Sequence, residues 1–252
     1  MRIGIIGAGR LGTVFARALS KDHEVLVNDR DMDNVKKLSL DIGIKPVKNI
    51  SEFSKLEMVI VAVKPAAVQE VISQIKDAQL IVSCAAGLTI KKLESFGSGN
   101  IIRIMPNIAA EVNEAVIAYS LHPEMEHKEK AFLTAFSALG LCIKIDESQL
   151  DPITAASGSG PAFIAYFAQA MIDEAISQGL HPSVAQKAVA QTLVGTGKLM
   201  LSGYDTKKVI DTVASPGGTT EAGLRMLEQS GVKKAIREAA GFSTQKAREI
   251  GK

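Results

Sequence analysis

The sequence has no excess of charge of either sign, because 29 lysine and arginine residues are matched by 27 aspartate and glutamate residues in a chain of 252. A net charge of +2 gives no electrostatic basis for a nucleic-acid or membrane surface. No run of about eighteen apolar residues is present, which argues against a membrane span. We therefore expect neither nucleic acid nor membrane among the partners of this chain.

Cysteine is scarce, and the two that occur, Cys84 and Cys142, lack CxxC spacing and ligand-rich surroundings. The four histidines are scattered without the spacing of metal ligands, so no metal site is expected. Two buried, reduced thiols are typical of a cytoplasmic protein. The first residues, "RIGIIG", form a strand pattern rather than a secretory signal, which also favours the cytoplasm.

What the sequence does contain, near its start, is a strand–helix–strand pattern around a glycine fingerprint. Residues 3–7 form a short apolar strand, residues 13–20 show helical periodicity, and residues 24–29 form a second strand. Between the first strand and the helix lies "GAGRLG" (7–12), which has the GxGxxG spacing of a dinucleotide-binding turn. The strand context is what gives the glycine spacing its meaning.

Each glycine of this turn has a physical role. Gly7 permits the tight turn, Gly9 lets the backbone approach a pyrophosphate, and Gly12 lets helix and strand pack closely. The pyrophosphate would then lie at the helix N-terminus, where free N–H groups and the positive end of the dipole favour an anion. We predict dinucleotide binding; the alternative is a tight turn without a ligand.

Two neighbouring residues give opposite indications about the cofactor. Asp29 lies at the end of the second strand, where a carboxylate accepts hydrogen bonds from the ribose hydroxyls and disfavours a 2′-phosphate. Arg30 follows it, and a guanidinium there could pair with a 2′-phosphate or remain a solvated charge. The residues lean slightly towards NADH and leave NADPH open.

Strand and helix patterns alternate through the rest of the first half, which predicts a mostly parallel, doubly wound α/β domain of the Rossmann type over residues 1–150. The further strands are expected at 58–65, 80–87, 100–107, 115–120 and 141–146. Ligands bind at the carboxyl ends of such strands, where small residues and prolines gather here. These ends would form the floor under a nicotinamide ring, with the candidates Ala62, Val63, Lys64, Pro65, Ala86, Gly87 and Asn107. Lys64 could equally be a solvated strand end.

From residue 151 to residue 252 the strand pattern stops and an all-helical domain is expected. The first long helix, beginning near Pro161, is apolar on almost every side between Ala162 and Ile172, so it must be buried. Because a domain of this size has little material to surround it, we expect a second subunit to cover the helix. The alternative is cover by the first domain and the other helices. The turn "SGSGPAF" (157–163) is expected to join the two domains.

A second glycine-rich segment, "SPGGTT" (215–220), precedes another helix. Gly217 and Gly218 remove side chains, so a ligand could reach the backbone. Ser215, Thr219 and Thr220 add hydroxyl donors at a helix N-terminus, where N–H groups have no partner. Together they could hold a carboxylate. An ordinary helix cap with turn glycines would explain the same residues equally well.

At this point the chain resembles the pyrroline-5-carboxylate reductase family almost from end to end. The resemblance lies in "GIIGAGRLG", "VAVKP", "SCAAGLT", "RIMPN", "ASGSGPAF" and, most specifically, "DTVASPGGTTEAGLRMLEQSG". It implies reduction of 1-pyrroline-5-carboxylate to L-proline with NADPH or NADH. It also implies a C-terminal dimerisation domain that interlocks two subunits, with dimers commonly assembling into decamers.

The resemblance assigns residues by position. It places Ile6, Gly7, Ala8, Gly9, Arg10 and Leu11 in the phosphate-binding turn, Asn49 against the adenosine part, and Val63, Lys64 and Ala86 near the nicotinamide. It places Ser215, Gly217, Gly218, Thr219 and Thr220 around the substrate carboxylate. Asp29 departs from the residue that NADPH-preferring members usually carry, which puts the choice of cofactor in doubt.

The chemistry needs little from the protein, because the cofactor supplies the hydride. Thr220 is the candidate catalytic residue, through a hydrogen bond to the imine nitrogen. No His, Lys or Asp in these loops is placed as a general acid, so we expect the imine to bind protonated or to take its proton from water.

Two alternatives remain. One is another imine reductase or a β-hydroxyacid-type reductase, although neither Lys187 nor Lys198 lies in a glycine–hydroxyl motif as such a proton donor would. The other is a non-catalytic relative that only binds a nucleotide.

Overall fold

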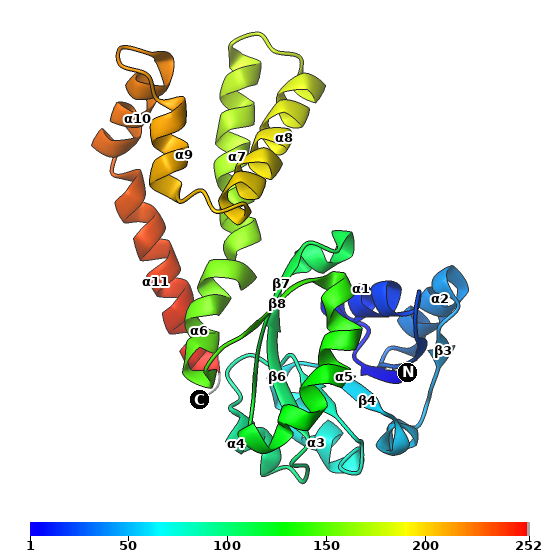
Figure 1. Ribbon diagram of the computed structural model, residues 1–252. Helices are drawn as coiled ribbons and strands as arrows, with labels where there is room; N and C mark the ends of the chain where they lie inside the picture. The colour runs from blue at the N-terminus through cyan, green and yellow to red at the C-terminus, as the bar shows by residue number, and fades with distance from the viewer. Residues whose placement is uncertain (251–252) are drawn as a thin grey trace. The chain divides into compact units, whose positions relative to one another are not determined.

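The computed structural model describes residues 1–250 and divides into two compact units (Figure 1). The first unit comprises residues 1–161 together with residues 242–250, and the second comprises residues 162–241. The first is an α/β unit and the second is all-helical. The α/β fold followed by a helical part, expected from the sequence, is therefore confirmed.

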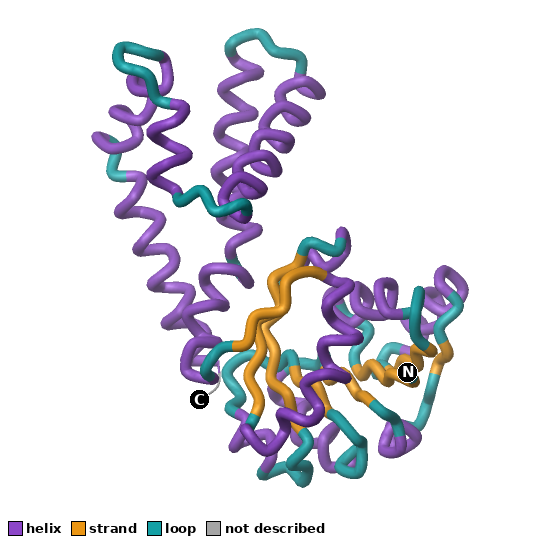
Figure 2. The backbone as a smooth tube through the Cα atoms, viewed as in Figure 1, coloured by secondary structure: helices purple, strands orange, loops and turns teal. Residues whose placement is uncertain are grey.

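The first unit is built on one eight-stranded sheet in the order β3-β2-β1-β4-β5-β6-β7-β8 (Figure 2). Neighbouring strands run parallel except β6 and β7, which are antiparallel. The order reverses direction at β1, as in doubly wound folds that bind ligands at this point. The strands are β1 (Arg2–Ile6), β2 (Glu24–Asn28), β3 (Lys45–Pro46), β4 (Met58–Val61), β5 (Ile81–Ser83), β6 (Ile101–Pro106), β7 (Ala115–Leu121) and β8 (Gly140–Lys144).

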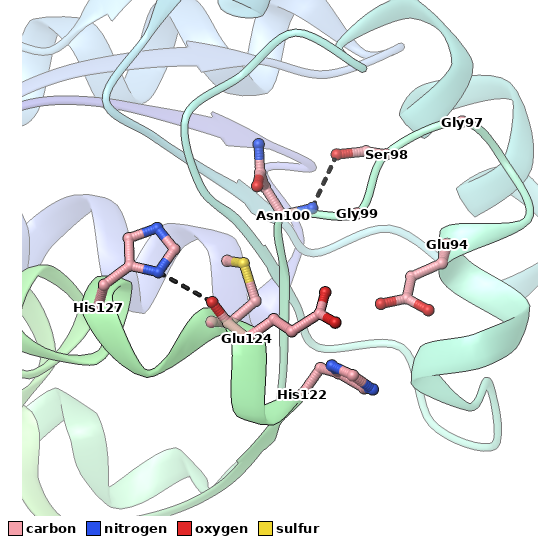
Figure 3. Close-up of a pocket in the computed structure, with 9 residues that line it drawn as sticks. Glu94, Gly97, Ser98, Gly99, Asn100, His122, Glu124 and His127 are labelled. Atoms are coloured by element: carbon pink, nitrogen blue, oxygen red, sulfur yellow. Dashed lines mark hydrogen bonds between the residues drawn. The ribbon is translucent and has the colours of Figure 1, made fainter.

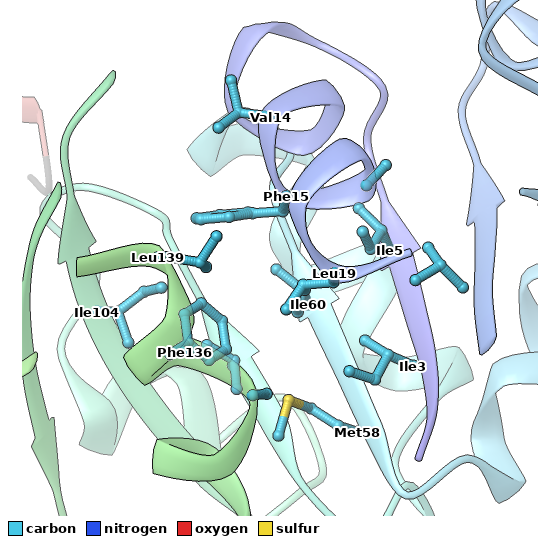
Figure 4. Close-up of a cluster of buried hydrophobic side chains, with 14 of the residues drawn as sticks. Ile3, Ile5, Val14, Phe15, Leu19, Met58, Ile60, Ile104, Phe136 and Leu139 are labelled. Carbon is cyan, nitrogen blue, oxygen red and sulfur yellow. The ribbon is translucent and has the colours of Figure 1, made fainter. Parts of the chain in front are cut away.

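One face of this sheet is covered by α1 (Arg10–Leu19), α2 (Met32–Ile42) and α5 (Glu126–Phe136). Alternate strand residues such as Ile3, Ile5 and Ile60 point to this face and are fully buried (Figure 4). Phe15 of α1 meets Phe136 of α5 edge to face, with ring centroids 5.6 Å apart. Because successive side chains of a strand point to opposite faces of the sheet, every second residue of each apolar run lies in this core.

The other half of each run points to the opposite face, where Val59, Val61 and Ile81 are buried. This face is covered by α3 (Pro65–Gln74), α4 (Ile90–Glu94) and the 3₁₀ helix η1 (Ile50–Lys55). Strands buried on both sides explain why the sequence shows continuous apolar runs rather than alternation.

The strands are shorter than the sequence suggested. The run at 80–87 leaves the sheet after Ser83, and the run at 58–65 leaves it after Val61. The residues beyond these ends turn away at the carboxyl edge of the sheet instead of extending it, since Gly87 has a φ of +77° and Pro65 begins α3. The two-residue strand β3 has no apolar run of its own, so it could not be predicted from the sequence pattern.

The first compact unit extends to residue 161, and the domain boundary after residue 150 stays a prediction from the sequence. The short helix α6 (Leu150–Ile153) and the π-helical turn η6 (Thr154–Gly158) remain with the first unit. Leu150 is fully buried against Met105 and Ala118. The end of the chain returns to this unit as well, because the hydroxyls of Ser159 and Ser243 are 2.8 Å apart.

The second unit has little interior of its own. Its helices are α7 (Gly160–Ser177), α8 (Pro182–Leu201), α9 (Thr206–Val213), α10 (Thr219–Gln229) and the first part of α11 (Val232–Ile250). In residues 162–241 only Ala168, Ala185 and Val189 are buried. None of the helices within residues 1–250 is both long enough and apolar enough to cross a membrane.

Candidate functional site

The cofactor candidates of the first unit share one edge of the sheet. The turn at 7–12 follows β1, Asp29 and Arg30 follow β2, and residues 62–65 follow β4. Ala86 and Gly87 come shortly after β5, and Asn107 comes directly after β6. These strands are adjacent in the sheet and parallel, so their carboxyl ends meet at the same edge. The fold therefore gathers residues that are about a hundred positions apart in the chain.

The glycine turn has the geometry that a dinucleotide requires. Gly7 has a φ of +105°, and a Cβ there would lie 2.6 Å from the carbonyl oxygen of Ala62. A Cβ on Gly12 would overlap the carbonyl oxygen of Gly7, so only glycine allows α1 to approach β1 this closely. A Cβ on Gly9, in contrast, would meet nothing within 4 Å. Gly9 thus leaves open space above the backbone, where a pyrophosphate can approach.

The N-terminus of α1 is free to bind an anion. Gly9 is its N-cap residue and provides no side-chain hydrogen bond, and the first turn contains Arg10 but no acidic residue. The first N–H groups of a helix have no intrahelical partner, and the helix dipole is positive there. The turn and the helix start therefore fit the pyrophosphate of a nicotinamide dinucleotide.

Asp29 is fixed by the backbone around it. One carboxylate oxygen accepts a hydrogen bond from the N–H of Ala8 at 2.5 Å, and the other accepts one from the N–H of Asp31 at 2.8 Å. The carboxylate thus links the end of β2 to the glycine turn. Arg30 points elsewhere, and its Nη2 lies 3.2 Å from Oε2 of Glu70 on α3.

The other strand ends carry candidates of two kinds. Lys64 is the N-cap residue of α3 without a side-chain bond, so a second open helix start lies at this edge. Asn49 and Asn107 already have partners: Asn49 accepts from Ser51 N–H at 3.1 Å, and Asn107 donates to Ser157 O at 3.2 Å. Both asparagines cap short helices, which is sufficient to explain their presence.

A buried ion pair supports this edge, and sequence reasoning missed it. Arg103 of β6 is only 4% exposed, and its Nη1 lies 3.1 Å from Oε1 of Glu147. The same oxygen accepts the N–H of Ile90 at 2.5 Å, at the start of α4. The pair therefore positions the segment that carries Ala86 and Gly87. An arginine inside the apolar strand "NIIRIMPN" was the signal that could have revealed it.

Cys84 lies directly after β5 at the same edge. Burial raises the pKa of its thiol to about 12, so the group remains protonated at neutral pH. A protonated thiol is a poor nucleophile. Cys142 has a pKa raised for the same reason, and neither cysteine forms a disulfide.

The segment 215–220 lies in the second unit, between α9 and α10. Gly217 has a φ of +72°, and the N–H of Gly218 donates to Ser215 O at 3.0 Å, which closes a tight turn. A Cβ on Gly218 would lie 2.5 Å from Oγ of Ser215, so a larger residue there would force this hydroxyl to rotate. Gly218 is the N-cap residue of α10 without a side-chain bond, and Thr219 and Thr220 are its first two residues. Their N–H groups are available to an anion.

Glu221 is the residue of this loop that sequence reasoning missed. Its Oε2 accepts a hydrogen bond from the N–H of Gly217 at 2.7 Å. Glutamate at the third position of a helix commonly reaches back to the backbone before it, so the spacing after Gly218 was the available signal. Glu221 braces the turn and uses one of the donors that the sequence offered to a ligand.

A separate hollow lies at the opposite edge of the sheet (Figure 3). It lies beside residues 97–100, which precede β6, and is also lined by Glu94, His122, Glu124 and His127. None of the candidate site residues lines it. Within residues 1–250 no three or more His, Cys, Asp and Glu side chains are grouped so that they could hold a metal ion.

Two family models match the chain. Residues 147–250 match pyrroline-5-carboxylate reductase dimerisation, and residues 2–87 match NADP oxidoreductase, coenzyme F420-dependent. The first match covers the helical part, and the second covers the glycine turn and the strands β1 to β5. Substrate binding and oligomerisation are supported by the first match.

Relatives match over the full length. Pyrroline-5-carboxylate reductase of Methanosarcina acetivorans is 33% identical over 100% of this chain and 98% of its own, and that of Aquifex aeolicus is 32% identical over 99% and 97%. Among solved structures, pyrroline-5-carboxylate reductase from Coxiella burnetii has a TM-score of 0.88 at 26% identity, covering 99% of this chain and 98% of its own. The Plasmodium falciparum pyrroline carboxylate reductase, solved with NADP bound, shares the fold with a TM-score of 0.87 at 24% identity, covering 100% and 98%. With a nucleotide-binding turn, a donor-rich loop and this likeness from end to end, the chain belongs to the pyrroline-5-carboxylate reductase family.

Proposed function

We propose that the chain reduces the carbon–nitrogen double bond of 1-pyrroline-5-carboxylate with NADH or NADPH and releases L-proline. The observation that carries the proposal is the absence of a side-chain cap at the two helix starts that follow glycine-rich turns, α1 at Gly9 and α10 at Gly218. Each offers backbone N–H groups to an anion. One suits a cofactor pyrophosphate and the other suits the single carboxylate of the substrate.

The residues of the first unit hold the cofactor. Ile6 to Gly12 receive the pyrophosphate, Asp29 and Asn49 lie on the adenosine side, and residues 62–65 with Ala86, Gly87 and Asn107 lie on the nicotinamide side. The cofactor, when bound, supplies the hydride. Arg30 is the remaining candidate on the adenosine side. These assignments are supported by the shared edge of the sheet and by the open space at Gly9.

The loop at 215–220 holds the substrate. The N–H groups of Thr219 and Thr220 and the hydroxyl of Ser215 hydrogen-bond the carboxylate, while Gly217 and Gly218 keep the turn free of side chains. The hydroxyl of Thr220 hydrogen-bonds the ring nitrogen. Glu221 is already the acceptor for Gly217, so we assign it to bracing the loop, and the imine binds in its protonated form.

The helical unit forms a homodimer in this proposal. Its support is the match to the family's dimerisation model and the large apolar side chains that α7 leaves exposed, among them Phe163, Ile164, Tyr166 and Phe167. Assembly of dimers into a decamer, a cytoplasmic location, and the absence of nucleic-acid and membrane partners are further parts of the proposal. The two unpaired cysteines are consistent with a reducing compartment.

A panel of substrates tests the proposal. The purified full chain is assayed with NADH or NADPH and either 1-pyrroline-5-carboxylate or a 2-keto acid. A separate assay combines a 3-hydroxy acid with the oxidised cofactor. Turnover of the cyclic imine alone is expected. Turnover of the keto or hydroxy acid without the imine would favour a β-hydroxyacid-type reductase. Cofactor binding without any turnover would favour a non-catalytic nucleotide-binding protein.

A further inference from the structure

We propose that Asp31 and Glu70, acting beside Asp29, make the adenosine end of the cofactor site select NADH over NADPH. The inference rests on the proposed function only in requiring that the glycine turn binds a nicotinamide dinucleotide. The two cofactors differ by one phosphate on the adenosine ribose, which adds a charge of about −1.5 to −2 near neutral pH. The question is therefore which charges surround that position.

Asp29 places the first negative charge there. The residue at the end of the second strand is the one that meets the 2′-hydroxyl in this fold. Both of its oxygens accept backbone hydrogen bonds, from Ala8 at 2.5 Å and from Asp31 at 2.8 Å, so the carboxylate cannot swing away from an incoming phosphate without breaking them. The glycine turn therefore holds the Asp29 carboxylate where it repels a 2′-phosphate.

Asp31 occupies another position where a 2′-phosphate could bind, the N-terminus of α2. Its Oδ1 accepts the N–H of Asp33 at 3.1 Å, and its Oδ2 accepts the side-chain amide of Asn34 at 3.1 Å. A carboxylate at the cap position already satisfies the donors and the helix dipole that would attract a phosphate. Asp33, two residues further on, is ion-paired with Lys36 at 2.8 Å.

Glu70 engages Arg30, the one cation in the turn after β2. The two side chains are 3.2 Å apart and are 81% and 69% exposed. An exposed pair of this kind is weak, so it does not immobilise Arg30. The pair nevertheless places the Glu70 carboxylate next to the guanidinium of Arg30. A phosphate that approaches Arg30 must therefore displace this carboxylate or be repelled by it.

Competing cations line a hollow beside the glycine turn and the first turns of α2. Arg10 and Lys37 lie there with Asn34 and the acidic Glu111, whereas Arg17 in the same hollow is ion-paired with Asp41. A 2′-phosphate that paired with Arg10 and Lys37 would gain an attraction that offsets the repulsion by the three carboxylates. This arrangement is the main rival to the proposal, and the experiment includes a variant that detects it.

The test measures the dissociation constants of NADH and NADPH by titration calorimetry with the full chain, without substrate. The variants are Asp31→Ser, which keeps a helix-capping side chain but removes the charge, Glu70→Gln, and the double variant. The matched control is Glu124→Gln, an exposed carboxylate at the opposite edge of the sheet. A further variant, Lys37→Gln, probes the rival seat.

We expect the wild-type chain to bind NADH at least about tenfold more tightly than NADPH, a difference of roughly 1.4 kcal/mol. The double variant is expected to tighten NADPH binding by roughly fivefold, with a change of less than about twofold for NADH, because only the phosphate meets the removed charges. Glu124→Gln should change neither constant.

Equal or tighter binding of NADPH by the wild-type chain would overturn the inference, and so would a double variant with an unchanged ratio. A selective loss of NADPH binding in Lys37→Gln would place the phosphate in the rival seat and overturn it as well. Because these are binding constants, the inference stands or falls separately from the activity. A chain that binds NADH selectively but never reduces the cyclic imine refutes the proposed function and leaves this inference intact.

Discussion

At the scale of single residues, some site candidates have a structural role in the fold and others do not. Asn49 and Asn107 cap helices, and Asp29 braces the glycine turn, so each has a structural reason to be present besides any contact with a cofactor. Thr220 has no such reason, because the N-cap of α10 is Gly218 and no side chain caps the helix. Thr220 is therefore the residue whose removal reports on function most cleanly.

We expect Thr220→Ala to lower kcat/KM for 1-pyrroline-5-carboxylate by at least about tenfold, roughly 1.4 kcal/mol, because the hydrogen bond to the ring nitrogen is lost. Thr220→Ser, which keeps the hydroxyl, should recover most of the activity. The matched control is Thr212→Ala on α9, whose hydroxyl bonds Lys208 O within its own helix. An unchanged kcat/KM in Thr220→Ala with an unchanged thermal midpoint would remove Thr220 from the mechanism.

Cys84 gives a second prediction at this scale. With a pKa near 12 its thiolate is scarce at pH 8, since a group at pKa 12 is ionised in only about one molecule in ten thousand there. Iodoacetamide at pH 8 should therefore label Cys84 at least roughly a hundredfold more slowly in the native chain than in urea. Mass spectrometry of the labelled peptide measures both rates. Equal rates would show that the thiol is not shielded.

At the scale of elements, the glycine turn shows how one short segment can be constrained for two different reasons. Gly12 is required by the fold, because a Cβ would overlap the carbonyl oxygen of Gly7. Gly9 is not required by the fold, because its surroundings are open. The same sequence motif thus contains one position for packing and one for the ligand.

This difference predicts opposite behaviour for two conservative substitutions. Gly12→Ala should lower the free energy of unfolding by about 1–3 kcal/mol, as expected for an overpacked site. Gly9→Ala should leave stability nearly unchanged but weaken NADH binding by at least about tenfold, because the methyl group occupies the pyrophosphate position. Urea unfolding and titration calorimetry separate the two effects. A Gly9→Ala variant that binds NADH normally would contradict the assigned position of the pyrophosphate.

Elements also show how much could be predicted from the sequence. The apolar runs and glycine spacing were sufficient for seven of the eight strands, all except β3, because a buried strand has a strong local signature. The runs could not show where each strand ends, since Ala62, Val63 and residues 84–87 are as apolar or small as the strands before them. Arg103 inside an apolar strand indicated a buried charge, but its partner Glu147 depends on the fold, as does the pairing of Arg30 with Glu70.

At the scale of the whole molecule, the helical unit contains more large apolar side chains than it buries within itself. Tyr166 of α7 is 85% exposed, and its large apolar neighbours Ile164 and Phe167 are also exposed. Monomeric proteins rarely leave a large apolar surface uncovered. Together with the match of residues 147–250 to a dimerisation family, this exposure supports a second copy of the chain as the covering partner.

We expect the double change Ile164→Lys and Tyr166→Glu to reduce the molar mass of the assembly in solution, because buried unpaired charges oppose association. Light scattering coupled to size-exclusion chromatography measures the mass. Leu40→Glu is the control, since Leu40 is 90% exposed on α2 in the first unit and its change should leave the mass unaltered. A mass that stays at the wild-type value in the α7 variant would show that these residues lie outside the interface.

In the proposed reaction a hydride passes from the nicotinamide to the imine carbon of 1-pyrroline-5-carboxylate. To test this transfer, the full chain is supplied with NADH or NADPH carrying deuterium at the transferable C4 position, and the amino acid formed is analysed by mass spectrometry and NMR. We expect L-proline with one deuterium, attached to the ring carbon next to nitrogen that had been the imine carbon. Cofactor oxidation without proline, or proline without the deuterium, would contradict it.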